Sequence, residues 1–538
     1  MLPLKGLAVV GQRQTKLKVL VVNVFFDDWR QETRSPNKIP QATAPIHLAG
    51  VFRRETCDVR IYNEHQKGPL TDETVFAWPD LLVLTGLNVA FDRMLHLTAY
   101  VRSKQPGVRV VAGGHAIRAM PNLAANYFDW ACTGDIEELG EIVADEFGAD
   151  YVADVYTPRF DLTEHNRWIS YIESSRNCNF KCNFCSMTGE RNPYQISSDN
   201  SLRDQILGMG YKHHFVFLDN NFYGGGKRAF VERMELMREL YEAKRFGGWS
   251  AMVTSDFFFD DSNLELAKRA GCVALFSGVE SFDNDTLRDA SKRQNTVLPQ
   301  FDVMYRCLEA GIMFHYGLVF DLSTRHLSDV RNELDILFDN PTITLPSFLS
   351  LTIPLIGTPF FSESVRKRHI LPKAKLRDFD GFTLTLRPRD PLEEVIPFVR
   401  DLPTLKGYRR RIVSKTARLL VRHRRKMTPF QLMLTASNAF LLSAPNVINA
   451  PLRSQRNRSP RTYITTTEHI DPLYSPQFRV DERFRDYFLP TYVTNADGEL
   501  SPALRKDYAA DGKRIGDLSS KRKSVKQATN AIESTEIA

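Results

Sequence analysis

Two successive series of apolar strands and helical stretches constrain the fold of this chain more than any other feature. The first series runs from residue 16 to about residue 149, with the strand-like runs LKVLVVNVF, CDVRIYN, DLLVLTGL and VRVVAGG. Alternation of strands with helices favours parallel pairing through crossover helices. The segment therefore predicts an α/β fold with a doubly wound, Rossmann-like sheet.

The second series begins at Trp168 with WISYIESSRNC. It continues through FVFLD, WSAMVTS, CVALFSGVES, FHYGLVFD and LPSFLSLTIPL. Six strands at this spacing predict a partial, open (β/α)6 barrel of the TIM type, whose functional residues lie where the strands end. The alternation is lost beyond about residue 379, where we expect a mainly helical or irregular region.

These patterns divide the 538 residues into five segments. We expect a leader at 1–15, the doubly wound domain at 16–150, the barrel at 165–378, a carboxy-terminal region at 379–511 and a disordered polar tail at 512–538. Three structured segments agree with the usual domain size of about 100–200 residues.

The composition excludes fibrous and wholly disordered proteins, because 43% of the residues are hydrophobic and 25% are charged. No window offers the ~18–20 apolar residues that cross a bilayer, and the first residues do not resemble a signal peptide. We therefore expect a cytoplasmic protein. An odd number of cysteines, seven, with three close together, indicates metal binding or catalysis in a reducing compartment rather than a disulfide framework.

The clustered cysteines are Cys178, Cys182 and Cys185, on one loop directly after the first barrel strand. Soft thiolate ligands favour an iron–sulfur cluster, and three of them leave one iron of a four-iron cluster open. The alternatives are chance and a structural zinc site. Zinc usually needs a fourth ligand at motif spacing, and the next histidines, His213 and His214, lie some thirty residues further on.

The stretch SSRNCNFKCNFCSM, which includes Phe184 before the third cysteine, resembles the signature of the radical S-adenosylmethionine (radical SAM) superfamily. The resemblance implies that the three cysteines bind a 4Fe-4S cluster and that the amino and carboxylate groups of SAM chelate the fourth iron. It also implies that one electron cleaves SAM to methionine and a 5′-deoxyadenosyl radical. Phe184 would lie beside the bound SAM.

Two further pairs of residues extend this resemblance. Asp219 and Asn220 follow the second strand, where family members carry acceptors for the amino group of SAM, and Glu280 and Ser281 match the next landmark. Ordinary turn, capping or ion-pair roles are the alternatives for these positions. Ser255 stands where an arginine is commoner, so we expect the SAM carboxylate to be held differently. The sequence identifies no catalytic side chain.

Residues 16–149 resemble the cobalamin-binding domain that precedes the barrel in one subclass of this family. The resemblance includes two glycine junctions at strand ends, Thr85-Gly86 and Gly113-Gly114, followed by His115. Glycines there let a ligand approach the backbone. His115 would contact the corrin or the nucleotide tail, with a capping or surface role as the alternative.

The segment lacks the Asp-x-His-x-x-Gly motif by which many carriers ligate cobalt. His65 and Gly68 are present, but Asn63 replaces the acid. We therefore expect cobalamin to bind with its lower face free of a protein histidine. The resemblance then implies methyl transfer to an unactivated carbon, with ring formation or rearrangement as alternatives; a domain that keeps the fold without the cofactor is another.

The net charge of +7 is concentrated at residues 406–426, which hold ten Lys/Arg and no acid. With the apolar stretch 427–448, this run predicts peripheral binding to an anionic membrane face. The alternatives are a helix covering the open mouth of the barrel and RNA binding. Nucleic acid is the weaker partner, because no aromatic-rich RNA module accompanies the charge.

These features favour an enzyme that methylates or otherwise remodels a small hydrophobic metabolite, such as a polycyclic lipid or a tetrapyrrole. Such an enzyme needs an electron donor of the flavodoxin or ferredoxin kind. The alternatives are a radical SAM protein that modifies tRNA or peptide, and a cobalamin or redox sensor without turnover.

Overall fold

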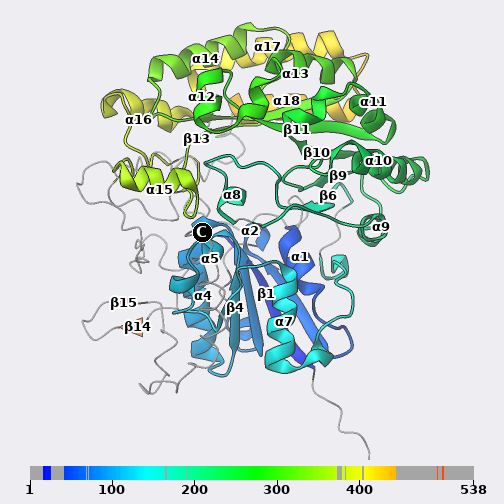
Figure 1. The fold of residues 1–538 in the computed structure, drawn as a ribbon, viewed down its shortest axis with the longest axis vertical. Coiled ribbons are helices and arrows are strands. Elements are labelled where there is room, and N and C mark those ends of the chain that lie inside the picture. Colours follow the sequence, from blue (N-terminus) through cyan, green and yellow to red (C-terminus); the bar gives the residue numbers. More distant parts are fainter. Residues whose placement is uncertain are drawn as a thin grey trace, which may run out of the picture.

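The computed structural model describes residues 16–25, 42–67, 70, 72–163, 167–190, 192–371, 379–381, 383–402, 405–443, 493–494 and 500–501. Figure 1 shows two layered α/β units, one built around each of two sheets, with the helix α8 between them. The leader at 1–15 and the tail at 512–538 lie outside the described residues, and the boundaries of the five segments stay predictions.

The amino-terminal sheet has five parallel strands in the order β2-β1-β3-β4-β5. Their bounds are β1 (Leu17–Val24), β2 (Cys57–Asn63), β3 (Leu81–Gly86), β4 (Arg109–Gly113) and β5 (Trp130–Ala131). The chain moves outward from β1 in both directions, which is the doubly wound arrangement that the strand–helix alternation predicts.

Helices cover both faces of this sheet. They are α1 (Thr43–Ala49), α2 (Glu64–Lys67), α3 (Glu73–Phe76), α4 (Phe91–Lys104), α5 (His115–Ala119), α6 (Pro121–Ala124) and α7 (Ile136–Phe147). Alternate residues of β1 enter two separate apolar cores, one with Leu20 and Val22 against α4 and one with Val19 and Val21 against α1 and α7. This division follows from the two-residue period of a strand and confirms the predicted fold class.

The second sheet has six parallel strands in the order β13-β12-β11-β10-β9-β6. The strands are β6 (Ile169–Ile172), β9 (His214–Phe217), β10 (Trp249–Val253), β11 (Cys272–Glu280), β12 (Met313–Phe320) and β13 (Phe348–Leu351). All six agree with the strands predicted from the sequence. Among the described strands β6 and β13 form the edges, so the sheet is a partial barrel.

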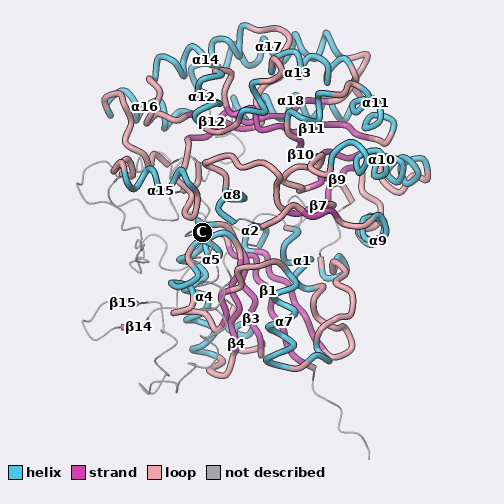
Figure 2. The backbone as a smooth tube through the Cα atoms, viewed as in Figure 1, coloured by secondary structure: helices cyan, strands magenta, loops and turns pink. Residues whose placement is uncertain are grey.

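The helices of this unit are α8 (Ser186–Glu190), α9 (Asp199–Gly208), α10 (Gly226–Glu242), α11 (Ser262–Arg269), α12 (Asn284–Asp289), α13 (Gln300–Glu309), α14 (Leu327–Asp339), α15 (Pro359–Arg366) and α16 (Leu392–Asp401). An antiparallel pair that the sequence did not predict, β7 (Ser175–Arg176) with β8 (Gln195–Ile196), brackets the cysteine loop. Figure 2 shows loops concentrated between the two sheets.

The two faces of the barrel sheet differ in exposure. Residues such as Phe217, Val253 and Leu275 are buried against helices α9–α14 in the largest core. The alternate residues remain partly accessible, and Phe348 is 40% exposed. The concave face of the barrel therefore keeps accessible side chains, as a face that receives a ligand requires.

The basic segment forms α17 (Arg409–His423), which is followed by α18 (Pro429–Ser443). Arg411 pairs with Asp335 and Asp339 of α14, so α17 packs on the outside of the barrel. Gln431 of α18 donates to the carbonyl oxygen of Val273 at 2.7 Å, at the amino end of β11. Helix α18 therefore lies at the amino ends of the strands, the end opposite to the cysteine loop, and α17 lies on the outside of the barrel.

In the part of the chain that the structure describes, no helix combines the length and the apolar character needed to cross a membrane. A second short antiparallel pair, β14 (Val493–Thr494) with β15 (Leu500–Ser501), lies near the carboxyl end of the sequence.

Candidate functional site

The cysteine loop begins where β7 ends and leads into α8. Asn177 adopts a left-handed backbone conformation (φ 63°), and its side chain donates to the carbonyl oxygen of Pro193 at 2.9 Å. The hydroxyl of Thr188 in turn donates to the carbonyl oxygen of Cys182 at 2.7 Å. These contacts close the loop on itself, so the three thiols have a fixed frame.

The three thiols lie within electrostatic range of one another. Burial raises the pKa of Cys178 and raises that of Cys185 to about 11, and the charge of the neighbouring cysteine thiolates adds to both shifts. Two groups donate to sulfur: the backbone N–H of Phe180 to Cys178 at 3.5 Å and the Gln294 amide to Cys182 at 3.6 Å. N–H donors to thiolate ligands tune iron–sulfur clusters.

Within the described residues, no three His, Cys, Asp or Glu side chains converge closely enough to hold one metal ion. The fit of the loop to a cluster rests on the ligand spacing, the shared electrostatics and the N–H donors to sulfur.

Asp219 lies at the predicted strand end, but its carboxylate is wholly buried. It accepts from the backbone N–H of Ser174 at 2.8 Å and from the hydroxyls of Ser174 and Ser175 at 2.6 Å each. Arg233 lies 3.9 Å away. Burial raises the pKa of Asp219, against the opposing effect of Arg233 and the serine donors. The carboxylate thus fastens the chain that enters the cysteine loop.

The two asparagines after Asp219 face different surroundings. Asn220 is exposed, whereas Asn221 is buried. The Asn221 amide donates to Asn179 Oδ1 at 2.8 Å, which ties the end of β9 to the cysteine loop. Of the two, Asn220 is the one whose side chain is accessible to a ligand.

Glu280 ends β11 in a left-handed conformation (φ 64°), next to a register shift in the pairing with β12. Its carboxylate pairs with Lys292, whose side chain is 9% exposed. The Lys292 ammonium lies 5.8 Å from the centroid of the Phe184 ring. A strained acidic residue beside a buried cation is typical of functional sites. The structure therefore brings Glu280 and Phe184 together, through a lysine that the sequence did not single out.

Ser281 and Ser255 are both occupied by protein groups. The Ser281 hydroxyl donates to Glu333 at 2.7 Å, and the Ser255 hydroxyl donates to Asn295 Oδ1 at 2.8 Å. Both serines are buried. Both hydroxyls therefore already bond to other side chains at the strand ends.

The four junction residues of the amino-terminal sheet lie side by side. Thr85 pairs with Gly113 in register, at the carboxyl ends of β3 and β4. Gly114 (φ 102°) lies so close to Gly86 that a Cβ atom on it would be 2.5 Å from the Gly86 carbonyl oxygen. A Cβ on Gly113 would meet nothing nearer than 3.8 Å. The close approach thus requires glycine at 114, not at 113.

Two buried amides beside these junctions have atoms without a hydrogen-bond partner among the described residues. They are Asn63 Nδ2, at the end of β2, and Asn88 Oδ1, two residues after Gly86. Both side chains are nearly inaccessible, at 1% and 4%. A bound ligand with amide or hydroxyl groups would satisfy them. His65 packs its ring 4.5 Å from that of Phe25.

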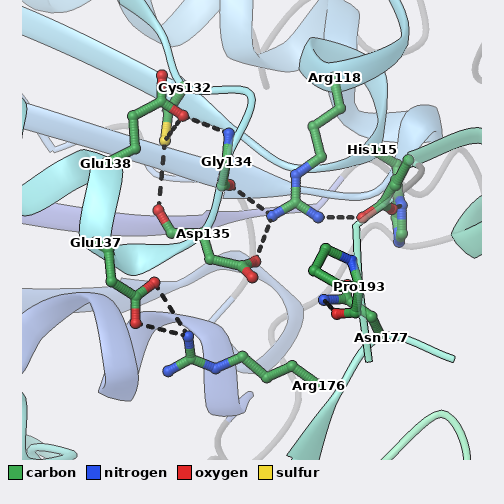
Figure 3. A network of polar contacts seen from close by, with 11 residues as sticks. His115, Arg118, Cys132, Gly134, Asp135, Glu137, Glu138, Arg176, Asn177 and Pro193 are labelled. Carbon is green, nitrogen blue, oxygen red and sulfur yellow. Dashed lines mark hydrogen bonds and ion pairs between the residues drawn. The ribbon is translucent and has the colours of Figure 1, made fainter. Parts of the chain in front are cut away.

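His115, the first residue of α5, contacts the carboxylate of Glu190, the last residue of α8. Arg118 pairs with the same carboxylate and with Asp135 at 2.9 Å. Figure 3 shows the Arg118 guanidinium between Asp135 and His115. These ion pairs join the glycine junctions of one sheet to the helix that follows the cysteine loop of the other.

A family model, the radical SAM superfamily, matches residues 172–323. That stretch contains the cysteine loop and the strand ends described above. Residues 172–323 are a radical SAM domain. The match covers well under half of the chain.

Two curated relatives are methylating enzymes by name. The hopanoid C-2 methylase of Rhodopseudomonas palustris (strain TIE-1) is 24% identical over 295 residues, which are 49% of this chain and 54% of the relative. The uncharacterized methyltransferase sll1242 of Synechocystis sp. (strain ATCC 27184 / PCC 6803 / Kazusa) is 23% identical over 376 residues, 65% of this chain and 67% of the relative. The chain thus spans about half to two thirds of these relatives.

Among solved structures, the cobalamin-dependent S-adenosylmethionine radical enzyme OxsB, determined with aqua-cobalamin bound, superposes with a TM-score of 0.52. The alignment covers 88% of this chain and 83% of that one at 13% identity. The radical SAM domain and the sheet before it therefore share a fold with OxsB.

Sequence reasoning missed several residues that hold the radical SAM domain together. Three of them touch the cysteine loop or its neighbours from distant parts of the sequence: Lys292, Gln294 and Arg118. The fourth, Glu190, lies five residues after Cys185. Only Glu190 carried a local signal, as the acid that closes the short helix after Cys185.

Proposed function

We propose that this protein cleaves S-adenosylmethionine reductively at a 4Fe-4S cluster and uses cobalamin to methylate a carbon of a small hydrophobic molecule. One observation carries the proposal. The helix after the cysteine loop and the helix after the Gly113-Gly114 junction are joined by the contacts of Glu190 with His115 and Arg118. The two candidate cofactor sites are therefore neighbours.

Cys178, Cys182 and Cys185 would hold the cluster. Their loop is closed by side-chain contacts, and N–H groups already donate to two of the sulfurs. When bound, the cluster would supply the electron that cleaves SAM, and cobalamin would carry the methyl group. An acidic flavodoxin or a ferredoxin would be a suitable electron donor.

Phe184, Asn220 and Glu280 would contact SAM directly, because their side chains are accessible or face the cysteine loop. Lys292 would contact SAM as well. The Glu280 carboxylate and the Lys292 ammonium, which pair with each other, match the amino and carboxylate groups of SAM. Asp219 and Ser281, which we also expect near SAM, would act by fixing the strand ends.

Cobalamin would lie over Thr85, Gly86, Gly113 and Gly114 with no histidine on cobalt. The unpaired amide atoms of Asn63 and Asn88 supply polar partners for a ligand rich in amide groups. His115 would act through Glu190 rather than through the corrin.

An apolar substrate agrees with the concave face of the barrel. Phe276 and Phe348 stack there at 5.8 Å with an interplanar angle of 17°. The Phe348 ring occupies the space over Gly317, where a Cβ atom would lie 2.2 Å from it. A flat aromatic surface of this kind favours a planar or polycyclic hydrophobic molecule. Relatedness to a hopanoid methylase supports the same substrate class.

The test compares Cys182→Ala with Cys57→Ser, a buried cysteine of the other sheet, in anaerobically reconstituted protein. We expect the wild type and Cys57→Ser to bind about four irons, to form 5′-deoxyadenosine from SAM under reducing conditions and to take up hydroxocobalamin, and Cys182→Ala to form no 5′-deoxyadenosine. Full SAM cleavage by Cys182→Ala would contradict the cluster assignment. Cobalamin uptake without any SAM cleavage by the wild type would favour a sensor.

A further inference from the structure

A buried acid joins the two candidate cofactor sites. Glu190 is five residues after Cys185, and its side chain is only 5% exposed. Its carboxylate is contacted by His115 and Arg118, both from α5. Although burial acts to raise the pKa of Glu190, the contacts with His115 and Arg118 lower it below its usual value. The acid therefore stays ionised, with its charge balanced from the other sheet.

The basic partner is itself fixed. Arg118 also pairs with Asp135 at 2.9 Å and donates to the carbonyl oxygen of Gly134 at 2.7 Å (Figure 3). The guanidinium therefore bridges two carboxylates, one before α7 and one at the end of α8. Its planar shape makes such bridging directional.

The backbone is closely packed around the contact of Glu190 with α5. A Cβ atom on Gly189 would lie 2.7 Å from the carbonyl oxygen of Gly357, and a Cβ atom on Gly357 would lie 3.1 Å from the Cβ atom of Ala119. Helix α8 thus meets the loop after β13 backbone to backbone, and Ala119 of α5 packs against the same loop. A displacement of α5 must move α8, and with it the end of the cysteine loop.

We propose that Glu190 is a positioning residue that couples the two cofactor sites, so that cobalamin and the iron–sulfur cluster each strengthen the binding of the other. This proposal rests on the proposed function. His115 directly follows Gly114, so a ligand that fixes this junction also fixes both partners of Glu190. Because this contact holds α5 and α8 together, an arrangement of α5 that suits cobalamin also sets the arrangement of the cysteine loop, which gives positive coupling between the two sites. Linkage makes that coupling reciprocal.

A matched control exists at the same boundary. Glu137 of α7 pairs with Arg176 at 3.0 Å. Arg176 lies two residues before Cys178, the first cysteine of the loop. This pair also joins the two units, but its side chains are 61% and 24% exposed (Figure 3). Solvent-exposed pairs contribute little to stability. Glu137→Gln therefore makes the same change in charge at the same boundary without touching the buried contact.

The experiment measures the dissociation constant of hydroxocobalamin by equilibrium dialysis, using the full chain with and without its reconstituted cluster. In the wild type we expect the cluster to tighten cobalamin binding at least about fivefold, the lower end of typical coupling. The ratio of the dissociation constant without the cluster to that with the cluster should fall to about 1 in Glu190→Gln, while the iron content stays at the wild-type level. Glu137→Gln should keep the wild-type ratio.

Retention of the wild-type ratio by Glu190→Gln, or equal loss in Glu137→Gln, would overturn the proposal. A wild-type ratio of 1 would overturn it as well and leave the cobalamin site standing. Absence of any cobalamin uptake would overturn both. If Glu190→Gln does not fold, His115→Asn and Arg118→Lys each remove or weaken one partner, and each should lower the ratio; unchanged ratios in both would overturn the proposal.

Discussion

The backbone of Gly114 touches that of Gly86 across the carboxyl edge of the amino-terminal sheet. A Cβ atom on Gly114 would lie 2.5 Å from the Gly86 carbonyl oxygen, and the residue has a φ of 102°. Both conditions exclude other residues, since a left-handed conformation alone costs an L-residue about 1–2 kcal/mol. The two junctions that would receive cobalamin are therefore held at a fixed separation by one glycine.

Gly114→Ala should consequently destabilise the protein by about 2 kcal/mol or more and reduce cobalamin uptake. Gly113→Ala should leave the stability nearly unchanged, because a Cβ there meets no protein atom nearer than 3.8 Å. Urea unfolding measures the stability of both variants, and dialysis with hydroxocobalamin measures the uptake by Gly114→Ala. An equal loss of stability in the two variants would contradict the assignment.

The sequence pattern predicted both sheets, because strand–helix alternation depends on residues close together in the chain. It did not distinguish Gly113 from Gly114, since both stand in the same glycine pair and only the approach of Gly86 separates them. Likewise, the carboxyl-end rule selected Asp219 as a contact of SAM, which stays a prediction. The partners of Asp219, Ser174 and Ser175, show that it braces the cysteine loop.

The residues that the sequence analysis missed were missed for one physical reason. Lys292 reaches Glu280 from the segment after α12, and Arg118 reaches Glu190 across 72 positions of sequence. Long side chains that pair across the fold leave no periodic or motif signal in the chain. Such contacts follow only from the three-dimensional arrangement of the two sheets.

Asp219→Asn should destabilise the protein by roughly 2–4 kcal/mol, because an amide cannot accept from all three serine donors and leaves buried groups unsatisfied. Reconstituted iron should fall with it, since Ser174 and Ser175 lead into the cysteine loop. Asn220→Ala, at the neighbouring exposed position, should keep wild-type stability and iron content and weaken only SAM binding. Urea unfolding, iron analysis and SAM titration compare the pair; wild-type iron content and stability in Asp219→Asn would contradict the bracing role.

Lys292→Met should weaken SAM binding roughly 10- to 100-fold, because hydrogen bonds to charged groups contribute about 1.5–3 kcal/mol. Decarboxylated SAM should bind the wild type and the variant with similar affinity, since it lacks the group that Lys292 would hold. Isothermal titration of both ligands into both proteins measures the difference. An equal loss for the two ligands would show that Lys292 acts on another part of the site.

Glu173, directly after β6, gives the protein a pH-dependent stability. Burial raises its pKa from the usual 4.5 to about 7, with a further contribution from the charge of Asp219. Between pH 4.5 and 7 the unfolded chain has lost this proton and the folded chain keeps it, so stability falls as the pH rises through that window and levels off above it. Because each pKa unit corresponds to about 1.4 kcal/mol, the loss is at most about 3 kcal/mol.

Glu173→Gln should remove this contribution. The variant should match the wild type near pH 4.5 and exceed its free energy of unfolding at pH 8, measured by urea unfolding across the range. Glu242→Gln, which makes the same change in charge at an exposed position of α10, serves as the control. A constant difference between Glu173→Gln and wild type at all pH values would contradict the raised pKa.

The outer face of α17 offers a basic surface with exposed apolar residues. Arg410 and Arg418 are exposed on it, together with Val413 and Val421, which are 58% and 65% accessible. Cations beside exposed apolar side chains favour an anionic lipid surface. This helix packs on α14, on the outside of the barrel, and α18 beyond it lies at the amino ends of the strands. Membrane binding here would therefore leave the cysteine end of the barrel away from the lipid.

We accordingly expect the protein to sediment with vesicles of phosphatidylcholine and phosphatidylglycerol in equal parts, and to be released as the salt is raised from about 0.1 to 0.5 M, because salt screens exposed charges. Arg410→Glu with Arg418→Glu should lower the bound fraction several-fold. The control carries the same two charge reversals at Arg228 and Arg245, exposed residues in and just after α10. Binding that resists salt, or an equal loss of the bound fraction in the control, would mean that the charge of α17 does not direct the protein to lipid. The helix would then serve only to cover the outside of the barrel.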